Sequence, residues 1–329
     1  MRPPLFAAAL GVALALTPAL ASASADRATS PVRSAIFYYP WYGTPSHDGT
    51  FQHWQQNGGR PPLLIASAFF PARGVYSSTD RVVVSAQMRE IAATGVDQVV
   101  VSWWGRGSAE DERLGLTAAA ARAAGLSVAA HVEPYPARSA HTVRLDIRYL
   151  ERLGISDVYV YRPDDLPAED WATLNDLVSA PMRVFAQTGR VGLAAAGHFD
   201  GVYTYDIVGL GGRTFRRICG QAHAAGLLCG PSVGPGYDAR RASADLRVKP
   251  RRFGVTYDSM WRAALASGAD LVTITSYNEW HEGTQIEPAR FKRGYRSYDG
   301  AWGRHGREAE TAYVDRTADW VERLEQSRG

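Results

Sequence analysis

Two glutamates near the C-terminal end of the chain are the side chains best suited to acid–base chemistry. Glu279 and Glu282 lie within the stretch 271–287, which begins as a β-branched apolar run typical of a buried strand. If the backbone makes one helical turn after that strand, both carboxyl groups face the same side. One protonated and one ionised carboxyl group are what glycoside hydrolysis needs. A solvated surface loop is the alternative interpretation, and Asn278 and Trp280 beside the acids argue against it.

Aromatic and polar side chains follow the other predicted strands in the same way. Rings can stack on sugars, while amide, imidazole and carboxylate groups can bind sugar hydroxyls. The pattern therefore predicts a sugar-binding cleft around the two carboxylates. The candidate substrate-binding residues are Tyr39, Trp41, Trp104, His131, Glu133, Tyr135, Tyr203, Tyr205, Tyr237 and Asn278.

Strand and helix patterns alternate along the chain, which predicts how these residues are brought together. The expected strands are 34–39, 97–104, 127–132, 158–161, 182–186, 201–205, 227–233 and 271–275. The expected helices are 82–93, 110–124, 140–152, 168–178, 213–225, 255–267 and 307–326. Eight such strands favour an α/β fold, a single (β/α)8 TIM-type barrel with its active site at the C-terminal ends of the strands. An open doubly wound sheet is the alternative, but no G-x-G-x-x-G follows the first strand.

Composition and the N-terminal sequence indicate the domain organisation and the cellular location of the protein. Residues 1–25 combine Arg2, an apolar run over 5–16 and small residues over 21–25, which predicts a secretory signal peptide followed by one barrel domain over 26–329. We therefore expect a secreted protein, extracellular or periplasmic, without stable membrane insertion. The net charge of +3 is too small to favour nucleic acid as a partner.

Other kinds of site have weaker support. The histidines form no H-E-x-x-H motif and no Cys cluster, so we expect neither a metal nor another cofactor. No G-x-S-x-G motif supports serine nucleophile chemistry. For Cys219 and Cys229, two free thiols are favoured over a disulfide, because a helix cysteine and a strand cysteine often point apart.

Six segments together resemble glycoside hydrolase family 99, the endo-α-1,2-mannosidases and endo-α-1,2-mannanases. They occur in order along nearly the whole expected mature chain, and the last of them is the most specific. The segments are FYYPWYG over 37–43, VSWW over 101–104, HVEPY over 131–135, FDGVYTY over 199–205, SVGPGY over 232–237 and TITSYNEWHEGTQIE over 273–287.

The resemblance implies a (β/α)8 barrel that needs no metal and cleaves α-linked mannose oligo- or polysaccharides internally, with retention. It implies that Glu279 is a base that removes the proton of the 2-hydroxyl, giving a 1,2-anhydro sugar, and that Glu282 is the acid for the leaving oxygen. By the same resemblance His131, Glu133, Tyr205 and Asn278 bind the sugar at the cleavage point. Trp104 then belongs to the subsite beyond it. We expect a monomer.

The chain departs from the family pattern in two places that border the expected cleft. Segment 238–252 is strongly basic where a Pro-Trp-Asn type sequence is usual, and 161–165 reads YRPDD instead of a Tyr-Asp-Ser-Tyr type sequence. The basic segment leaves open the alternative that the chain hydrolyses another α-linked glycan, one that carries negative charge. A solvated loop explains the basic residues of this segment as well. A non-catalytic glycan-binding barrel is the remaining alternative, and the intact Glu279 and Glu282 argue against it.

Overall fold

The computed structural model describes residues 33–178 and 180–327. Parallel strands form the centre of the fold, each short and almost wholly buried. They are β1 (Ser34–Tyr38), β2 (Gln98–Trp103), β3 (Ser127–Val132), β4 (Asp157–Val160), β5 (Arg183–Gln187), β6 (Gly201–Tyr203), β7 (Leu228–Gly230), β8 (Ser232–Val233) and β11 (Val272–Ile274). An antiparallel pair, β9 (Tyr237–Asp238) and β10 (Val248–Lys249), lies outside this sheet.

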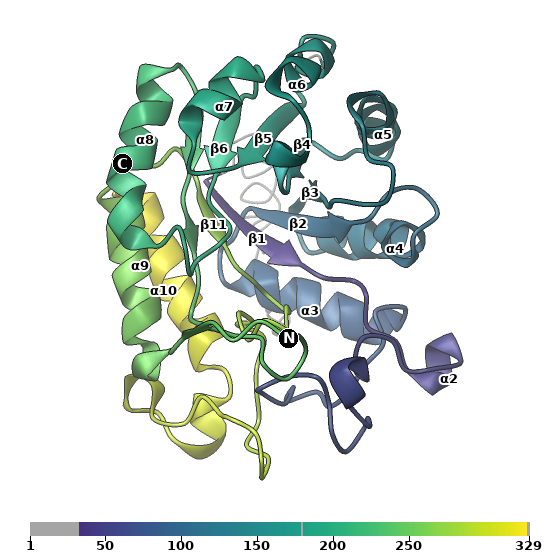
Figure 1. The fold of residues 1–329 in the computed structure, drawn as a ribbon. Coiled ribbons are helices and arrows are strands. Elements are labelled where there is room, and N and C mark those ends of the chain that lie inside the picture. Colours follow the sequence, from purple (N-terminus) through teal and green to yellow (C-terminus); the bar gives the residue numbers. More distant parts are fainter. Residues whose placement is uncertain (1–32, 179, 328–329) are drawn as a thin grey trace, which may run out of the picture. The chain divides into compact units, whose positions relative to one another are not determined.

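The sheet closes on itself through the segment around Pro231. Its order is β7-β6-β5-β4-β3-β2-β1-β11-β8, so its two ends, β7 and β8, are neighbours along the chain. The single strand expected over 227–233 is divided there, because proline has no N–H to donate to the ladder. The Pro231 carbonyl still accepts the Thr273 N–H at 3.0 Å. The predicted (β/α)8 barrel is thereby confirmed (Figure 1).

Helices surround the strands, as the gaps between the strand patterns predict (Figure 1). They are α2 (Pro45–Asp48), α3 (Arg81–Ala93), α4 (Ala109–Ala123), α5 (Ala140–Arg152), α6 (Ala168–Asn175), α7 (Val191–Ala196), α8 (Gly212–Ala224), α9 (Val255–Leu265) and α10 (Ala312–Gln326). Short 3₁₀ turns occur at Gln56–Gly58, Pro163–Asp165, Arg252–Gly254, Ala301–Gly303 and Gly306–Ala309.

Local sequence sets where several of these helices begin. Asp80 caps α3 and Ser108 caps α4, while Ser139 and Thr142 form a capping box at the start of α5. Two expectations were wrong. Sequence reasoning placed no helix between the fifth and sixth strands, where the six-residue α7 is too short to show a periodic pattern. The last helix begins at Ala312 and not at 307, because a 3₁₀ turn occupies Gly306–Ala309.

Alternation along the strands separates two apolar regions. On β1, Phe37 points into the barrel, where it packs with rings from other strands, including Tyr159, Phe185 and Tyr203. Ile36 belongs to the larger core between the strands and the helices. The barrel is therefore filled by side chains beneath its C-terminal end, as expected for eight strands.

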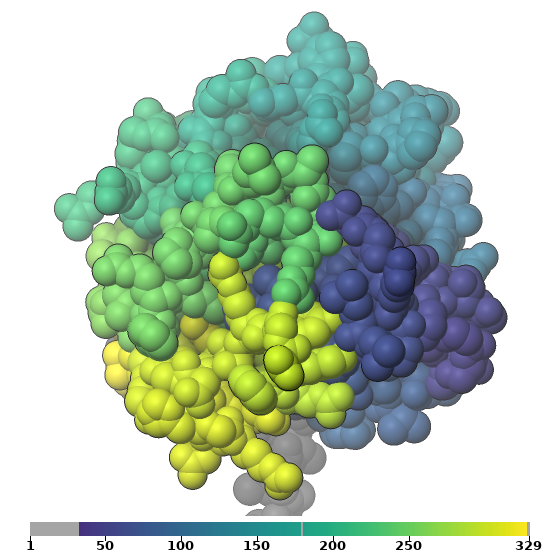
Figure 2. Space-filling view, turned by 60° about the horizontal axis from the view of Figure 1, so that its bottom comes forward, coloured from purple at the N-terminus to yellow at the C-terminus, as the bar shows by residue number. Residues whose placement is uncertain are grey.

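Three loops meet on one face of the barrel domain. They come from residues near 57–67, 239–247 and 291–298, and Figure 2 shows their dark blue, green and yellow surfaces in contact. The Asn57 side chain donates to the Arg241 carbonyl at 3.2 Å, and Arg241 in turn donates to the carbonyls of Ser67, at 3.2 Å, and Gly294. The basic segment is therefore part of an ordered set of loops.

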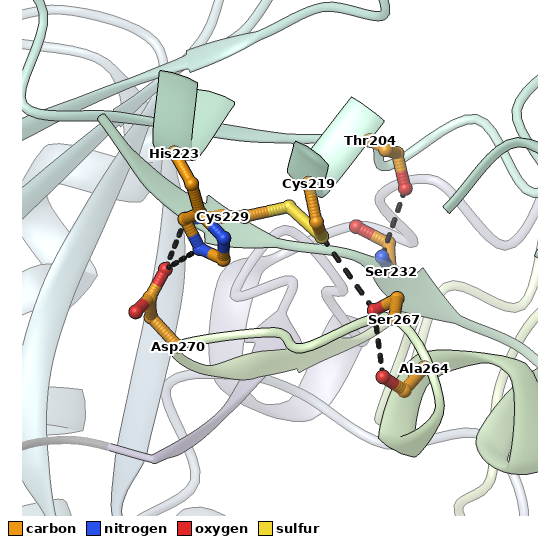
Figure 3. Close-up of a disulfide and its surroundings, with 8 residues drawn as sticks. All are labelled: Thr204, Cys219, His223, Cys229, Ser232, Ala264, Ser267 and Asp270. Atoms are coloured by element: carbon orange, nitrogen blue, oxygen red, sulfur yellow. Dashed lines mark hydrogen bonds and ion pairs between the residues drawn. A yellow bond between two sulfur atoms is a disulfide. The ribbon is translucent and has the colours of Figure 1, made fainter. Parts of the chain in front are cut away.

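The two cysteines form a disulfide, so the expectation of two free thiols was wrong. Cys219 on α8 and Cys229 on β7 have Cα atoms 5.2 Å apart, within the range that a disulfide spans. Figure 3 shows the bond beside Asp270, whose carboxylate accepts the Cys229 N–H at 2.8 Å. The packing of α8 against β7 turns the two side chains toward each other, which their positions in the sequence do not reveal.

The predicted signal peptide, 1–25, lies outside the described residues. Among the helices of the described part, none is both long and apolar enough to cross a membrane.

Candidate active site

A cavity of about 290 Å³ lies at the C-terminal ends of the barrel strands. Eight of the predicted site residues line it: Tyr39, Trp41, Trp104, His131, Glu133, Tyr205, Glu279 and Glu282. The side chains that the sequence pattern placed at strand ends thus converge on one space, because the ends of parallel strands in a closed barrel share one face.

A tight turn after β11 presents the two glutamates. The turn forms over 280–283, where the Gly283 N–H donates to the Trp280 carbonyl at 3.3 Å, and it replaces the helical turn that the spacing suggested. Gly283 has a φ of +65°, and a Cβ there would meet the Asp238 backbone at 3.2 Å, so glycine is needed at this position. The Asp238 N–H donates to the Glu282 carbonyl at 2.7 Å and fixes the turn against β9.

Asn278 holds the wall of the cavity and does not line it. Its side chain is fully buried, with Oδ1 accepting the Tyr39 N–H at 2.7 Å and Nδ2 donating to the Tyr39 carbonyl at 3.0 Å. This two-sided pairing joins the β11 loop to the end of β1. The sequence placed Asn278 on the sugar, whereas the structure places its amide on the backbone of a residue that lines the cavity.

Glu287 is the centre of a buried network behind the same loop, which sequence reasoning missed. Its carboxylate is fully buried and accepts bonds at 2.8 Å from Tyr76 Oη, Trp280 Nε1 and Gln87 Nε2. Arg73 Nε donates to it at 3.2 Å. Burial raises the pKa of Glu287, while Arg73 and the donors oppose that shift. The network anchors the segment that follows the two glutamates.

A second network holds His131 and Glu133 at the end of β3. The His131 Nε2 lies 2.8 Å from Tyr203 Oη, and its Nδ1 lies 3.0 Å from Glu133 Oε1. Ser102 donates to the same Glu133 oxygen at 2.8 Å. Tyr203 is fully buried inside the barrel, so it positions His131 from below and does not line the cavity.

Tyr205 is held in a backbone conformation that non-glycine residues rarely adopt. Its φ is +39°, and its N–H donates to Ser232 Oγ at 2.7 Å while its carbonyl accepts from Thr275 Oγ1 at 3.2 Å. The Tyr205 hydroxyl contacts that of Tyr39. Backbone strain of this kind is often found at functional sites.

Two further predicted residues border neighbouring spaces. Tyr135 lines a second cavity, of about 460 Å³, that shares Trp104 with the first. Tyr237 lines a small cavity, of about 50 Å³, that shares Glu282. The first cavity also includes Tyr161 and Arg162, which sequence reasoning did not choose because 161–165 departs from the family pattern.

Burial dominates the electrostatics of the carboxyl pair. Burial and the neighbouring Glu282 raise the pKa of Glu279 well above its usual value, against hydrogen bonds from the backbone N–H groups of His281, at 3.1 Å, and Glu282. Burial, followed by the charges of Glu133 and Asp206, raises the pKa of Glu282 to about 7. The pair therefore keeps at least one proton near neutral pH.

Two histidines near Glu279, His281 and His53, have pKa values lowered far enough to be neutral near pH 7. Burial and His53 lower the pKa of His281 to about 3, and burial with Arg113 lowers that of His53 to about 4. The His281 Nε2 donates to the His53 carbonyl at 2.9 Å, which leaves Nδ1 unprotonated at 3.7 Å from Glu279. His53 stacks on Trp41 at 4.6 Å between ring centroids. These imidazoles form a wall and supply no charge to neutralise Glu279.

The described residues contain no group of three or more His, Cys, Asp or Glu side chains arranged to hold a metal ion. What the cavity provides is a proton donor and a proton acceptor side by side, enclosed by aromatic rings. That arrangement can protonate a leaving oxygen and deprotonate a hydroxyl without a cofactor.

Comparison with known proteins identifies related sequences and structures. The model of glycosyl hydrolase family 99 matches residues 32–167 and 184–326. A glycoprotein endo-alpha-1,2-mannosidase-like protein of Danio rerio is 31% identical over 310 residues, covering 77% of this chain and 70% of its own length. A glycoprotein endo-alpha-1,2-mannosidase of Xenopus laevis is 30% identical, covering 77% and 69%. The structure of the GH99 endo-alpha-mannosidase from Bacteroides thetaiotaomicron superimposes with a TM-score of 0.82 and 29% identity, covering 92% of this chain and all of that one.

Proposed function

This chain belongs to glycosyl hydrolase family 99 and is therefore a glycoside hydrolase, and we propose that it cleaves internal α-1,2-mannosidic bonds with retention. One observation carries the proposal. The family's barrel delivers Glu279 and Glu282 from one turn into one cavity lined by aromatic rings. The names of its relatives, endo-alpha-1,2-mannosidase and endo-alpha-mannosidase, supply the substrate class.

In the proposed reaction Glu279 acts on the 2-hydroxyl of the sugar at the cleavage point. It takes the hydroxyl proton as O2 bonds to C1, the bond from C1 to the leaving oxygen breaks, and Glu282 gives its proton to that oxygen. In a manno sugar the 2-hydroxyl is trans to an α-linked leaving group, so O2 can attack from the opposite face. Water then opens the resulting 1,2-anhydro sugar, with Glu282 accepting a proton from water and Glu279 returning its proton to O2.

These roles require Glu282 to be protonated and Glu279 to be ionised when the reaction begins. Because deep burial raises the pKa of Glu279 and so favours its protonated form, it opposes that arrangement. The two backbone N–H groups that point at Glu279 favour it, since a carboxylate that accepts such bonds is stabilised in its charged form. Glu282 borders the solvent-connected cavity and is partly exposed. We assign the negative charge to Glu279 because these two backbone N–H groups donate to its carboxylate.

We infer that the leaving group lies on the side of Glu282 that faces Tyr237. Glu282 lines both the main cavity and the small one, as an acid between the two halves of the substrate must. Arg247 also lines the small cavity, but it binds Asp245 at 2.7 Å and lies 3.7 Å from Asp206. Its charge is therefore neutralised, which favours an uncharged leaving sugar.

An acidic α-glycan is the second candidate, motivated by the arginines of the basic segment. Arg240, Arg241 and Arg296 line a separate cavity of about 500 Å³, in which Arg240 and Arg296 bind Asp238 at 2.8 and 2.9 Å. Arg251 is packed over the Tyr298 ring at 4.7 Å. A steep loss of activity with salt, together with a preference for a phosphorylated mannan, favours this candidate over a neutral substrate.

We also propose that the protein is exported and that its mature chain begins near Asp26. The apolar run over 5–16 and the small residues over 21–25 support this. N-terminal sequencing of protein secreted by an expressing cell tests it. An N-terminus at Met1 on the recovered protein contradicts the proposal.

The decisive experiment is digestion of α-1,2-branched mannan, with separation of the products. We expect discrete short oligosaccharides from the wild type, none from Glu282→Gln, and unchanged release from Glu151→Gln, an exposed glutamate on α5. Glu282→Gln should still bind mannan, because the glutamine keeps the shape of the site and loses only the proton donor. Full activity of Glu282→Gln contradicts the assignment. Binding of mannan by the wild type without cleavage identifies a glycan-binding barrel instead.

A further inference from the structure

A second cavity adjoins the active site at Trp104. Its volume is about 460 Å³, and Trp104 forms part of the walls of both spaces. The loops after β2 and β3 border the two cavities in succession, with Pro134 on the first and Tyr135 and Pro136 on the second. Trp104 and these two loops therefore link the walls of the two cavities.

The position of the acid gives this extension a direction. Glu282 lines both the main cavity and the small one that Tyr237 lines, and in the proposed reaction the leaving group lies toward Tyr237. Trp104 follows β2, whereas Tyr237 follows β8. In the order of strands around the barrel, two strands lie between β2 and β8, and three lie between β2 and β6. Trp104 is thus on the opposite side of the barrel from the leaving group. The second cavity lies on the non-reducing side of the cleaved bond.

The walls of the second cavity have the chemistry of a sugar subsite. Tyr135 and Trp104 supply aromatic rings, and the Tyr135 hydroxyl contacts Asp146 and donates to Thr142 at 3.0 Å. Arg106 pairs with Asp146 at 3.2 Å, leaving the guanidinium side chain 43% exposed. Because the two charges compensate, the cavity suits hydroxyl groups and not an acid.

Glycine allows Tyr135 to pack closely against the loop that follows Trp104. Gly105 has a φ of +91°, and a Cβ there would lie 3.2 Å from the Tyr135 ring. The backbone conformation therefore favours glycine, and the close approach allows Tyr135 to pack beside the loop.

We propose that this second cavity binds one further neutral α-linked mannose, on the non-reducing side of the two sugars that the main cavity holds. The inference rests on the proposed function and extends it. The enzyme then prefers side chains at least three sugars long on that side of the bond, and Arg106 is a specificity-determining residue that donates to the added sugar.

Two donors with the same fluorogenic leaving group test this, one carrying α-mannobiose and the other α-mannotriose. For the wild type we expect kcat/KM to be about tenfold higher for the longer donor, the effect of one good charge-assisted hydrogen bond. Arg106→Ala and Leu145→Trp should each remove that advantage, bringing the ratio of the two kcat/KM values close to one. Leu145 lines the cavity and is 40% exposed, so a larger ring there fills the space without disturbing the core.

Leu153→Trp is the matched control, since Leu153 directly follows α5 and is 36% exposed but does not line the cavity. It should preserve the tenfold preference. Equal kcat/KM for the two donors in the wild type overturns the inference, as does a preference that survives both variants. If the wild type cleaves neither donor nor mannan, the proposed function itself is wrong. Cleavage of the short donor without an advantage for the long one refutes only the second subsite.

Discussion

Replacement of Glu282 by glutamine should stabilise the protein above neutral pH. Burial raises the pKa of this carboxyl group from 4.5 to about 7. Below pH 4.5 the group is protonated in both the folded and the unfolded chain, so its titration has no effect on stability. As the pH rises from 4.5 to 7, the unfolded chain loses the proton while the folded protein keeps it, so the free energy of unfolding falls. Above pH 7 both states are ionised and the loss is complete.

The size of the effect follows from the two pKa values. The difference between 4.5 and about 7, at about 1.4 kcal/mol for each pH unit, amounts to about 3 kcal/mol. Solvent reaches the partly exposed carboxyl group through the cavity, so we expect about 2 kcal/mol. For a domain of about 300 residues, with an unfolding entropy near 0.6 kcal/mol/K, this corresponds to about 3 °C in Tm.

The assay is thermal unfolding of the wild type and of Glu282→Gln at pH 4.5 and pH 8, followed by circular dichroism. The difference in Tm between the two proteins should be about 3 °C more favourable to the variant at pH 8 than at pH 4.5. Comparing the two pH values cancels any pH-independent effect of the amide. Glu151→Gln, on the exposed side of α5, should show no such change between the two pH values.

A Tm difference that is the same at both pH values refutes this reasoning, because it means that the folded and unfolded states bind the same number of protons at this position. A variant that loses stability between pH 4.5 and pH 8 relative to the wild type refutes it more strongly. That result means the folded protein stabilises the Glu282 carboxylate instead of penalising it.

Three further predictions concern the supports of the site. Glu287→Ala should lower the free energy of unfolding, measured by chemical denaturation, by about 3 kcal/mol, because it leaves several buried donors without an acceptor. A loss below about 1 kcal/mol contradicts the role of this network. Asn278→Asp should lower kcat more than it changes KM, since a carboxylate cannot donate to the Tyr39 carbonyl and the wall of the cavity shifts; unchanged kcat excludes this role. Reduction of the Cys219–Cys229 bond should lower stability by about 3 kcal/mol, as expected for a link across 10 residues, and the double Cys→Ser variant should be insensitive to reductant.

The reactive residues and the barrel could be predicted from local sequence because both depend on local patterns. Eight apolar strands separated by helices admit few other folds, and a residue at the end of a parallel strand lies near the ends of its neighbours. This reasoning predicts that Glu279, Glu282 and Glu133 lie close together, and all three line one cavity. It failed where one residue changes the outcome, as at Pro231, which divides the expected seventh strand.

For some of the predicted residues, the sequence did not reveal whether the side chain faces the cavity. Tyr203 and Tyr205 are two residues apart near the end of β6, yet Tyr203 is buried beneath His131 and Tyr205 lines the cavity. Asn278 is adjacent to Glu279 and turns toward the Tyr39 backbone. The sequence shows which residues lie at the end of a strand, but the path of the backbone after the strand determines where each side chain points.

The sequence by itself determined the family and the barrel and singled out the candidate carboxyl pair, because strand periodicity and a compact motif are properties of neighbouring residues. Only the tertiary structure decided the pKa of Glu282, which depends on burial and on Glu133 and Asp206 from other strands. It likewise decided the partners of Glu287, which include Arg73, 214 residues away. These interactions act through space between distant parts of the chain, so they exist only once the barrel has closed.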